Sequence, residues 1–176
     1  MLKNNSEFDL TVSVNIDFFD ENGSIIGTDS ETQYAFEAGT ETIFVFIPDE
    51  KFEKMEYELD VEKEEWFETV VSDLSYEVFE AENKVILAVT NNGEKAAEFV
   101  EGHVLFFNGE IPVGHDYHYF IDNDSELKPG KTIKQEMTCY EDFDNVKVYL
   151  MGRRSLNNQN KSAPHKRVRT CVSFNL

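Results

Sequence analysis

The sequence lacks the segments that mark membrane-spanning, exported and zinc-binding chains. No stretch of its 176 residues approaches the roughly 18 continuous apolar residues of a transmembrane helix. The N-terminus, MLKNNSEFDL, has no apolar signal-peptide core, so any export signal is expected to lie outside this chain. Two cysteines, Cys139 and Cys171, form no CxxC or Cys/His cluster, which argues against structural zinc. A disulfide between them stays open and would need an oxidising compartment.

Catalytic signatures are also missing. The chain contains no GxSxG, HExxH, P-loop or GxGxxG motif, and its Ser, His and Asp residues have no diagnostic spacing. The numerous carboxylates could form an acid–base pair by chance, so this absence alone does not exclude enzymatic chemistry. We predict a protein that is not an enzyme and uses no cofactor.

Basic residues are scarce before the C-terminal tail. The formal net charge is −19, and all 35 acidic residues lie at or before Asp144. That part carries only nine basic residues and a net charge of −26, whereas the remaining tail carries +7. An acidic body repels phosphate backbones, so we expect no nucleic-acid partner. The acidic excess is typical of a solvated, soluble surface.

The residues that are abundant favour strands. Fifteen Phe and seven Tyr, with few Ala and Leu, fit a pleated, half-buried surface better than a helix. A hydrophobic fraction of 40% is enough for a packed core, and the length suits one large domain or two small ones. We therefore predict an all-β protein.

One phrase occurs twice in the chain. FFDENGSIIG at residues 18–27 matches FFNGEIPVG at residues 106–114. Extended outward, Asn4 aligns with Asn91 at an offset of 87 residues, Phe18 with Phe106 at 88, and the segment from Phe52 to Leu59 with residues 143–150 at 91. Offsets that stay constant within segments and change only at loops indicate a duplicated module.

Each copy has strand periodicity. Apolar residues alternate with polar ones, and Asn-Gly turns separate the runs, which predicts hairpins in an antiparallel sandwich. In copy one the alternating residues are Leu10, Val12, Val14, Ile16, Thr42, Phe44, Phe46, Met55, Tyr57 and Leu59. In copy two they are Val104, Phe106, Ile133, Gln135, Met137, Cys139, Val146, Val148 and Leu150.

Copy one is predicted to lack its leading strands. Two further strands, at 74–79 and 84–90, precede Asn91, whereas only three residues precede Asn4. The missing strands would expose an apolar face and an unpaired edge. Either the chain is cut from a longer parent, or another segment fills the gap.

The C-terminal residues 166–176 are a candidate filler, since they alternate as a basic strand. Pairing with the vacant edge of acidic copy one is one alternative. Pairing with copy two is favoured by chain proximity.

We divide the chain into four segments on this basis. Residues 1–62 form the first sandwich module, 63–74 a connector, 75–152 the second module, and 153–176 a basic tail that ends in the candidate added strand. Within the connector, Trp66, Phe67, Val70, Val71 and Leu74 have helical spacing, but the segment could equally be a strand.

The repeated phrase resembles the motif that names the FxLYD family of bacterial domains. The resemblance rests on the segments Ile16 to Asp20 and Val104 to Asn108, together with the upstream Asn-Asn-Ser and Asn-Asn-Gly. Copy two departs from the motif, because Asn108 stands where the family has Asp. The resemblance implies immunoglobulin-like β-sandwiches, an extracellular or cell-envelope location in a bacterium, and no known catalytic residues. The function expected from it is a spacer or protein-interaction module with an unidentified protein partner.

Two clusters are candidates for ion binding. Asp122, Asp124 and Glu126 alternate as in a calcium loop, but the loop lacks the glycine and distal glutamate of an EF-hand. A cation- or small-ligand-binding role for this loop is the alternative function, and an Asx turn is its structural interpretation. His115, Asp116 and His118 lie near His103, but residues 115 and 118 point to opposite faces of a strand. We predict no metal site and name no ligand-binding or catalytic residues.

Overall fold

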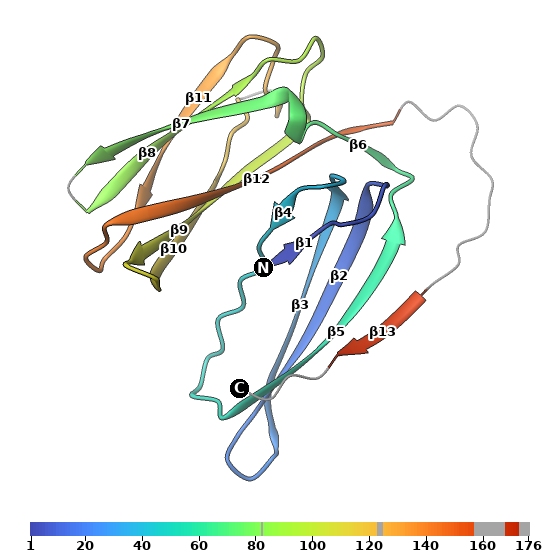
Figure 1. Cartoon of the computed structure of the whole chain (residues 1–176), viewed down its shortest axis with the longest axis vertical. Coiled ribbons are helices and arrows are strands. Elements are labelled where there is room, and N and C mark those ends of the chain that lie inside the picture. The colour runs from blue at the N-terminus through green and yellow to red at the C-terminus, as the bar shows by residue number, and fades with distance from the viewer. Residues whose placement is uncertain (82, 123–124, 157–167, 173–176) are drawn as a thin grey trace. The chain divides into compact units, whose positions relative to one another are not determined.

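The protein is all-β, as its composition predicts. The computed structural model describes residues 1–81, 83–122, 125–156 and, for the backbone alone, 168–172 (Figure 1). These ranges contain thirteen strands and one short 3-10 helix, η1 (Val71–Asp73). Within them, no helix has the length and apolar character needed to cross a membrane.

The chain divides into two compact units. The first comprises Met1–Glu65 and Asn157–Leu176, and the second Trp66–Leu156. These boundaries differ from the expected ones, and the first unit runs to Glu65 rather than to residue 62. Residues 66–74 of the predicted connector form a strand and η1 within the second unit, and the second unit ends at Leu156 rather than at residue 152.

The second unit consists of two antiparallel sheets that share one core. One sheet has the order β10-β9-β12-β6, and the other has the order β11-β8-β7. The strands of the first are β10 (Ile111–Tyr119), β9 (Phe99–Asn108), β12 (Asn145–Ser155) and β6 (Phe67–Thr69). Those of the second are β11 (Thr132–Thr138), β8 (Lys84–Asn91) and β7 (Leu74–Ala81). Twelve buried residues from both sheets form the core, among them Leu87 of β8 and Phe106 of β9. This arrangement is consistent with a β-sandwich.

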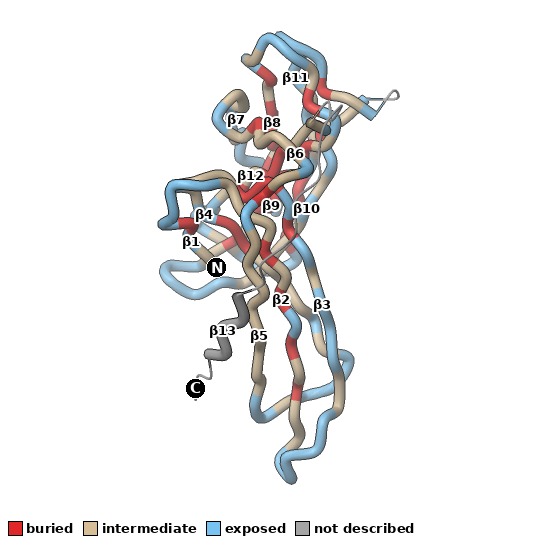
Figure 2. The backbone as a smooth tube through the Cα atoms, turned by 90° about the vertical axis from the view of Figure 1, so that its right-hand side faces the viewer, coloured by how far each residue is buried: buried red, intermediate tan, exposed pale blue. Residues whose placement is uncertain are grey.

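The first unit has one large sheet and one small one. The large sheet has the order β13-β5-β2-β3, and β1 pairs only with β4. The strands are β1 (Leu2–Lys3), β2 (Leu10–Phe19), β3 (Ile25–Phe36), β4 (Glu41–Thr42), β5 (Lys54–Lys63) and β13 (Val168–Val172). Burial alternates along β2, because every second side chain faces the core (Figure 2). The core cluster contains only Val12, Val14 and Phe36 as buried members.

The C-terminal strand belongs to the first unit. β13 pairs antiparallel with β5, Val168 opposite Val61 and Val172 opposite Tyr57. The alternative that chain proximity favours, an edge of copy two, was wrong. The expectation that this strand fills the gap left by the missing leading strands was also wrong, because β13 extends the sheet of β2 and β3 at its β5 edge, whereas β7 and β8 belong to the other sheet of the second unit. The corresponding edge of the second unit, on β12, is already paired with β6 through residues 67–69.

The repeated phrase forms the same bulged hairpin in both units. Phe18 lies opposite Gly27 and Phe19 opposite Ile25, so Ile26 is the extra residue. Phe106 likewise lies opposite Gly114 and Phe107 opposite Pro112, so Val113 is the extra residue. The strand orders β3-β2-β5 and β10-β9-β12 also agree. The aligned positions therefore have equivalent places in the two sheets.

The asparagine that precedes each hairpin has the same role in both units. Asn4 is buried, and its Nδ2 donates to the carbonyls of Phe8 and Phe36, both at 2.9 Å. The Nδ2 of buried Asn91 donates to the carbonyls of Lys95 at 2.9 Å and Leu127 at 2.8 Å.

The backbone amide of Asn4 donates to Thr40, and that of Asn91 donates to Lys131. A buried amide side chain that satisfies two carbonyls in each unit explains why the motif recurs.

Candidate functional site

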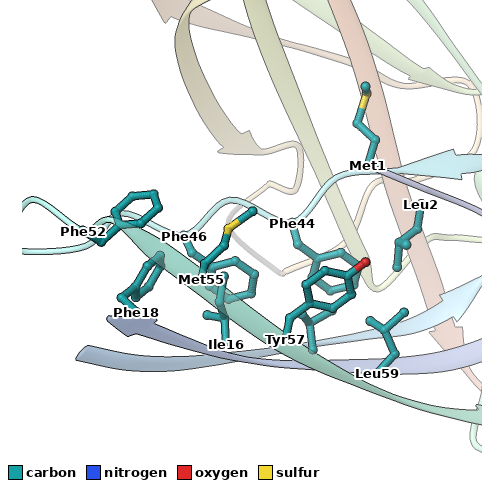
Figure 3. Close-up of a pocket in the computed structure, with 11 residues that line it drawn as sticks. Met1, Leu2, Ile16, Phe18, Phe44, Phe46, Phe52, Met55, Tyr57 and Leu59 are labelled. Carbon is teal, nitrogen blue, oxygen red and sulfur yellow. The ribbon is translucent and has the colours of Figure 1, made fainter. Parts of the chain in front are cut away.

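An apolar hollow lies in the first unit, over the inner face of β2 and β5. It has a volume of about 330 Å³ and is open to solvent (Figure 3). Its floor is formed by alternate residues of the two strands, and its side by the segment that follows β4. We call it the groove; its lining residues are Met1, Leu2, Val14, Ile16, Phe18, Phe44, Phe46, Phe52, Met55, Tyr57 and Leu59.

The groove is apolar almost throughout. Ten of its eleven lining residues have hydrocarbon or thioether side chains, and the hydroxyl of Tyr57 is the sole polar side-chain group. Figure 3 shows Phe44 and Phe46 leaning over the sheet from one side, and Phe52 near Phe18 at one end. The rings of Phe18 and Phe52 lie 5.1 Å apart in a tilted contact. Such a surface suits apolar groups.

The second unit shows what covers this face when the sheet is complete. The residues equivalent to Ile16 and Phe18 are Val104 and Phe106, which have no exposed surface. They belong to one core cluster with Val85, Leu87 and Val89 of β8. Among the described residues of the first unit, only β1 occupies the position of β8, and it is two residues long. The groove is therefore the face that β8 closes in the second unit.

The backbone beside the groove is also without a strand partner in the described chain. β4 pairs with β1 through Glu41 and Thr42, and residues 43–48 that follow have no strand assignment. They include the apolar run Ile43 to Ile47, in which the Ile47 side chain is 81% exposed. An apolar segment with an unpaired backbone is a template for strand addition.

The part of the sequence that forms the groove is acidic. Residues 1–65 contain 18 acidic and four basic residues, a formal net charge of −14. The strand that joins the outer edge of β5, β13, comes from the basic tail. The first unit therefore favours positively charged partners through long-range attraction.

The predicted cation loop is only partly described. Residues 123–124 lie outside the described residues, so the carboxylate of Asp124 has no described position. Around them, the amide of Asp122 donates to the carbonyl of Glu126 at 3.1 Å, and the amide of Ser125 donates to that of Asp122 at 2.9 Å. Ser125 has a φ of 64°, as in a tight turn. In the described part of the chain no three His, Cys, Asp or Glu side chains gather as a metal ion requires.

Within the histidine cluster, the structure brings His103 and His115 together and leaves His118 apart from them. His103 and His115 lie on adjacent strands with Nδ1 and Nε2 3.0 Å apart and stacked rings, and Nε2 of His103 lies 3.4 Å from Glu101. Burial, and then the neighbouring His103, lower the pKa of His115 below its ordinary value. The sequence interpretation of these residues as surface histidines was wrong for His103, which is buried.

Asp116 lies apart from this pair, because its Oδ2 accepts from the amide of Thr138 at 2.8 Å. His118 pairs with Gly102 in the sheet and has no described contact with the His103–His115 pair.

The thiol of Cys139 is free and buried in the core of the second unit. The side chain of Cys171 lies outside the described residues.

Sequence reasoning anticipated an exposed apolar face in copy one but not its shape. The walls that Phe44, Phe46 and Phe52 provide were missed. The sequence of residues 43–48 alternates like a strand, but the structure assigns no strand there. The signal that could have found the groove is the alignment itself. Strand β8 has no counterpart in the first copy beyond Leu2 and Lys3.

A scan of the chain against models of known protein families finds no match, and a search of curated proteins finds none either. The resemblance to the FxLYD family therefore stays a prediction from the motifs.

Proposed function

We propose that this chain is a non-enzymatic protein-interaction module of an extracellular or cell-envelope protein, built from two immunoglobulin-like units, and that the groove of the first unit is its binding surface. The location and the immunoglobulin-like class rest on the resemblance to the FxLYD family. The binding surface rests on one observation: a face that is closed by a strand in the second unit is an open apolar groove in the first.

The chemistry of the groove favours binding over catalysis. An apolar concavity that exposes aromatic rings gains free energy when a partner removes it from water. Tyr57 contributes the single polar side-chain group of the lining. A spacer role needs no such surface, since a spacer is best served by a polar exterior. The groove therefore supports interaction rather than spacing as the primary role.

The proposal is tested by selecting peptides that bind the full chain from a displayed random library. Peptides that also bind the Phe46→Ser variant are removed by counter-selection. We expect the remaining peptides to be enriched in aliphatic residues, because Phe46 lines the groove. The Ile47→Ser variant is the matched control, since Ile47 is largely exposed and lies outside the groove lining. An absence of peptides that distinguish Phe46→Ser from the wild-type chain would refute the proposal.

Calcium titration calorimetry separates this function from cation binding by the loop around Asp122. The interaction module predicts no heat and no shift in melting temperature when calcium is added. A saturable heat that disappears in Asp122→Asn would favour the cation-binding alternative instead.

A further inference from the structure

The ladder between β1 and β4 is a short remnant of the ladder between β8 and β11. Leu2 lies opposite Thr42 and Lys3 opposite Glu41. The equivalent pairs in the second unit are Val89 with Ile133 and Thr90 with Thr132. There the ladder continues for five more pairs, from Ala88 opposite Lys134 to Lys84 opposite Thr138. In the first unit it ends after two pairs among the described residues.

The residues that would continue this ladder are 43–47. They are equivalent to residues 134–138 of β11, at the constant offset of 91. Phe44 and Phe46 line the groove, so alternate side chains already face inward as they would in a strand.

Hydrogen-bonded pairs alternate along an antiparallel ladder. The amide of Asn4 donates to Thr40, so the next residues whose N–H and C=O face a partner are Thr42, Phe44 and Phe46.

We propose that the groove binds an extended segment of a partner protein as an added strand, antiparallel to residues 43–47, in the position that β8 has in the second unit. This inference rests on the proposed function and names its partner. The segment closes the groove with its side chains and pairs its backbone with Phe44 and Phe46. Binding by strand addition obtains affinity from main-chain hydrogen bonds and specificity from alternate side chains.

The second unit defines the side chains that such a segment needs. Gln135 and Met137 are the equivalents of Phe44 and Phe46. Leu87 lies opposite Gln135, and Val85 lies opposite Met137. Both Leu87 and Val85 have no exposed surface. The partner segment therefore carries aliphatic residues at two positions separated by one residue. Lysine or arginine at its flanks is favoured by the net charge of −14 on residues 1–65.

The open side of the added strand also follows from the comparison. In the second unit Ile86 lies opposite Phe79 of β7, which pairs along the other edge of β8. No equivalent of β7 is present among the described residues of the first unit. The backbone N–H at the position of Ile86 would thus face solvent in the complex, and a methyl group there is expected to be tolerated.

The probe is a fluorescein-labelled peptide with the sequence of residues 84–88, KVILA, because β1 already fills the places of Val89 and Thr90, and it is flanked by two lysines at each end for solubility. Fluorescence anisotropy measures its binding to the full chain. N-methylation at the position of Leu87 removes a ladder hydrogen bond and is expected to weaken binding at least tenfold. N-methylation at the position of Ile86 leaves hydrophobicity equal and is expected to change binding less than twofold.

A second readout locates the bound strand on the protein. Amide hydrogen exchange followed by NMR should show new protection at Phe44 and Phe46 when the peptide is added, and much less at Val45. The Phe46→Ser variant should lose binding at least tenfold, whereas Ile47→Ser should retain it. Unchanged exchange in β2, β3 and β5 of the first unit confirms that both variants remain folded.

Three results would overturn the inference. Equal weakening by the two N-methyl peptides would show that the backbone register is not used. Peptides selected against the groove that have aliphatic residues at helical spacing, i and i+3 or i+4, would leave the proposed function intact but replace the strand by a helix. Groove-dependent dimerisation of the chain, detected by light scattering and lost in Phe46→Ser, would identify a second copy as the occupant.

Discussion

The two units differ in the size of the core cluster that their equivalent sheets form. Phe106 packs edge-on against Phe143, with ring centroids 4.8 Å apart, and has no exposed surface. Its equivalent Phe18 meets Phe52 at 5.1 Å but forms part of the groove floor. The core cluster of the second unit has twelve buried members, and that of the first has three. The difference follows from one hairpin, β7 and β8, which covers the inner face of the second unit.

This comparison separates what makes a sheet from what makes a core. The hairpins, bulges and asparagine bridges are the same in both units, so they need only local sequence and the neighbouring loop. Burial of the inner face needs a second layer of comparable area. The first unit has the sheet without that layer, and its residual apolar surface is available to a partner.

The largest expected effect comes from truncating the equivalent phenylalanines. Phe106→Ala should destabilise the second unit by about 3–5 kcal/mol, because it leaves a cavity in an enclosed core. Phe18→Ala should cost the first unit less, because Phe18, although only 4% exposed, borders the groove rather than a closed core. Denaturant unfolding monitored by hydrogen exchange and mass spectrometry assigns each loss to its unit. Equal costs would contradict the difference in enclosure.

A smaller and equal effect is expected from the buried asparagines. Asn91→Ala and Asn4→Ala each leave two carbonyls without their donor, at a cost of about 1–3 kcal/mol. The costs should agree within about 0.5 kcal/mol, because each asparagine bridges two carbonyls in the same way. Denaturant unfolding monitored by hydrogen exchange and mass spectrometry measures both costs. A much smaller cost at Asn4 would show that the bridge depends on the second layer.

A still smaller effect should be confined to the second unit. Arg154 holds Glu68 through two hydrogen bonds of 2.8 Å that join β12 to β6. The hydrogen bonds from Arg154 lower the pKa of the Glu68 carboxyl group below its ordinary value. Arg154→Ala should destabilise the second unit by about 1 kcal/mol, less at high salt because Glu68 is partly exposed. Loss of exchange protection in residues 67–69, with the first unit unchanged, is the expected result.

The smallest effect is a dependence on acid at the two hairpin turns. Backbone amides, first that of Ser24, lower the pKa of Asp20 below 3.8, and the amide of Gly109 does the same for Asp144. A depressed folded-state pKa contributes stability that is present above the unfolded value and is lost as pH falls through the folded value.

Asp20→Asn should therefore weaken the first unit at pH 7, and the deficit should vanish below about pH 3. Asp144→Asn should do the same in the second unit. Melting temperatures recorded from pH 7 to pH 2.5 test this, and a deficit that persists at the lowest pH would contradict it.

Much of the fold could be predicted because it is written in short-range patterns. Alternation located β2, β5, β9 and β12, and glycine with asparagine located the turns. The role of Asn4 and Asn91 could not be predicted, since one of the two carbonyls that each bridges lies 32 or 36 residues away in sequence. Residues 66–74 were ambiguous because a three-residue strand and a 3-10 turn leave no clear period. That ambiguity concealed the pairing of β6 with β12, and with it the edge available to β13.

The sequence predicted that the first unit has an exposed apolar face, but it did not predict which residues form the walls of the groove. A count of strands in the two copies indicated an exposed apolar face. The positions of Phe44 and Phe46 depend on a segment that has strand alternation but no strand assignment. Local propensity alone does not decide the conformation of this segment, because a strand also needs a neighbouring strand to pair with.

The pairing of β13 with β5 has a consequence for the order in which the protein is made. The last residue of β5, Lys63, and the first of β13, Val168, are separated by more than a hundred residues. At roughly 5–20 residues per second, translation leaves the edge of β5 bare for several seconds after that strand has emerged from the ribosome. The half of the chain that is synthesised first is thus the half whose sheet is completed last, after the other half has had time to fold.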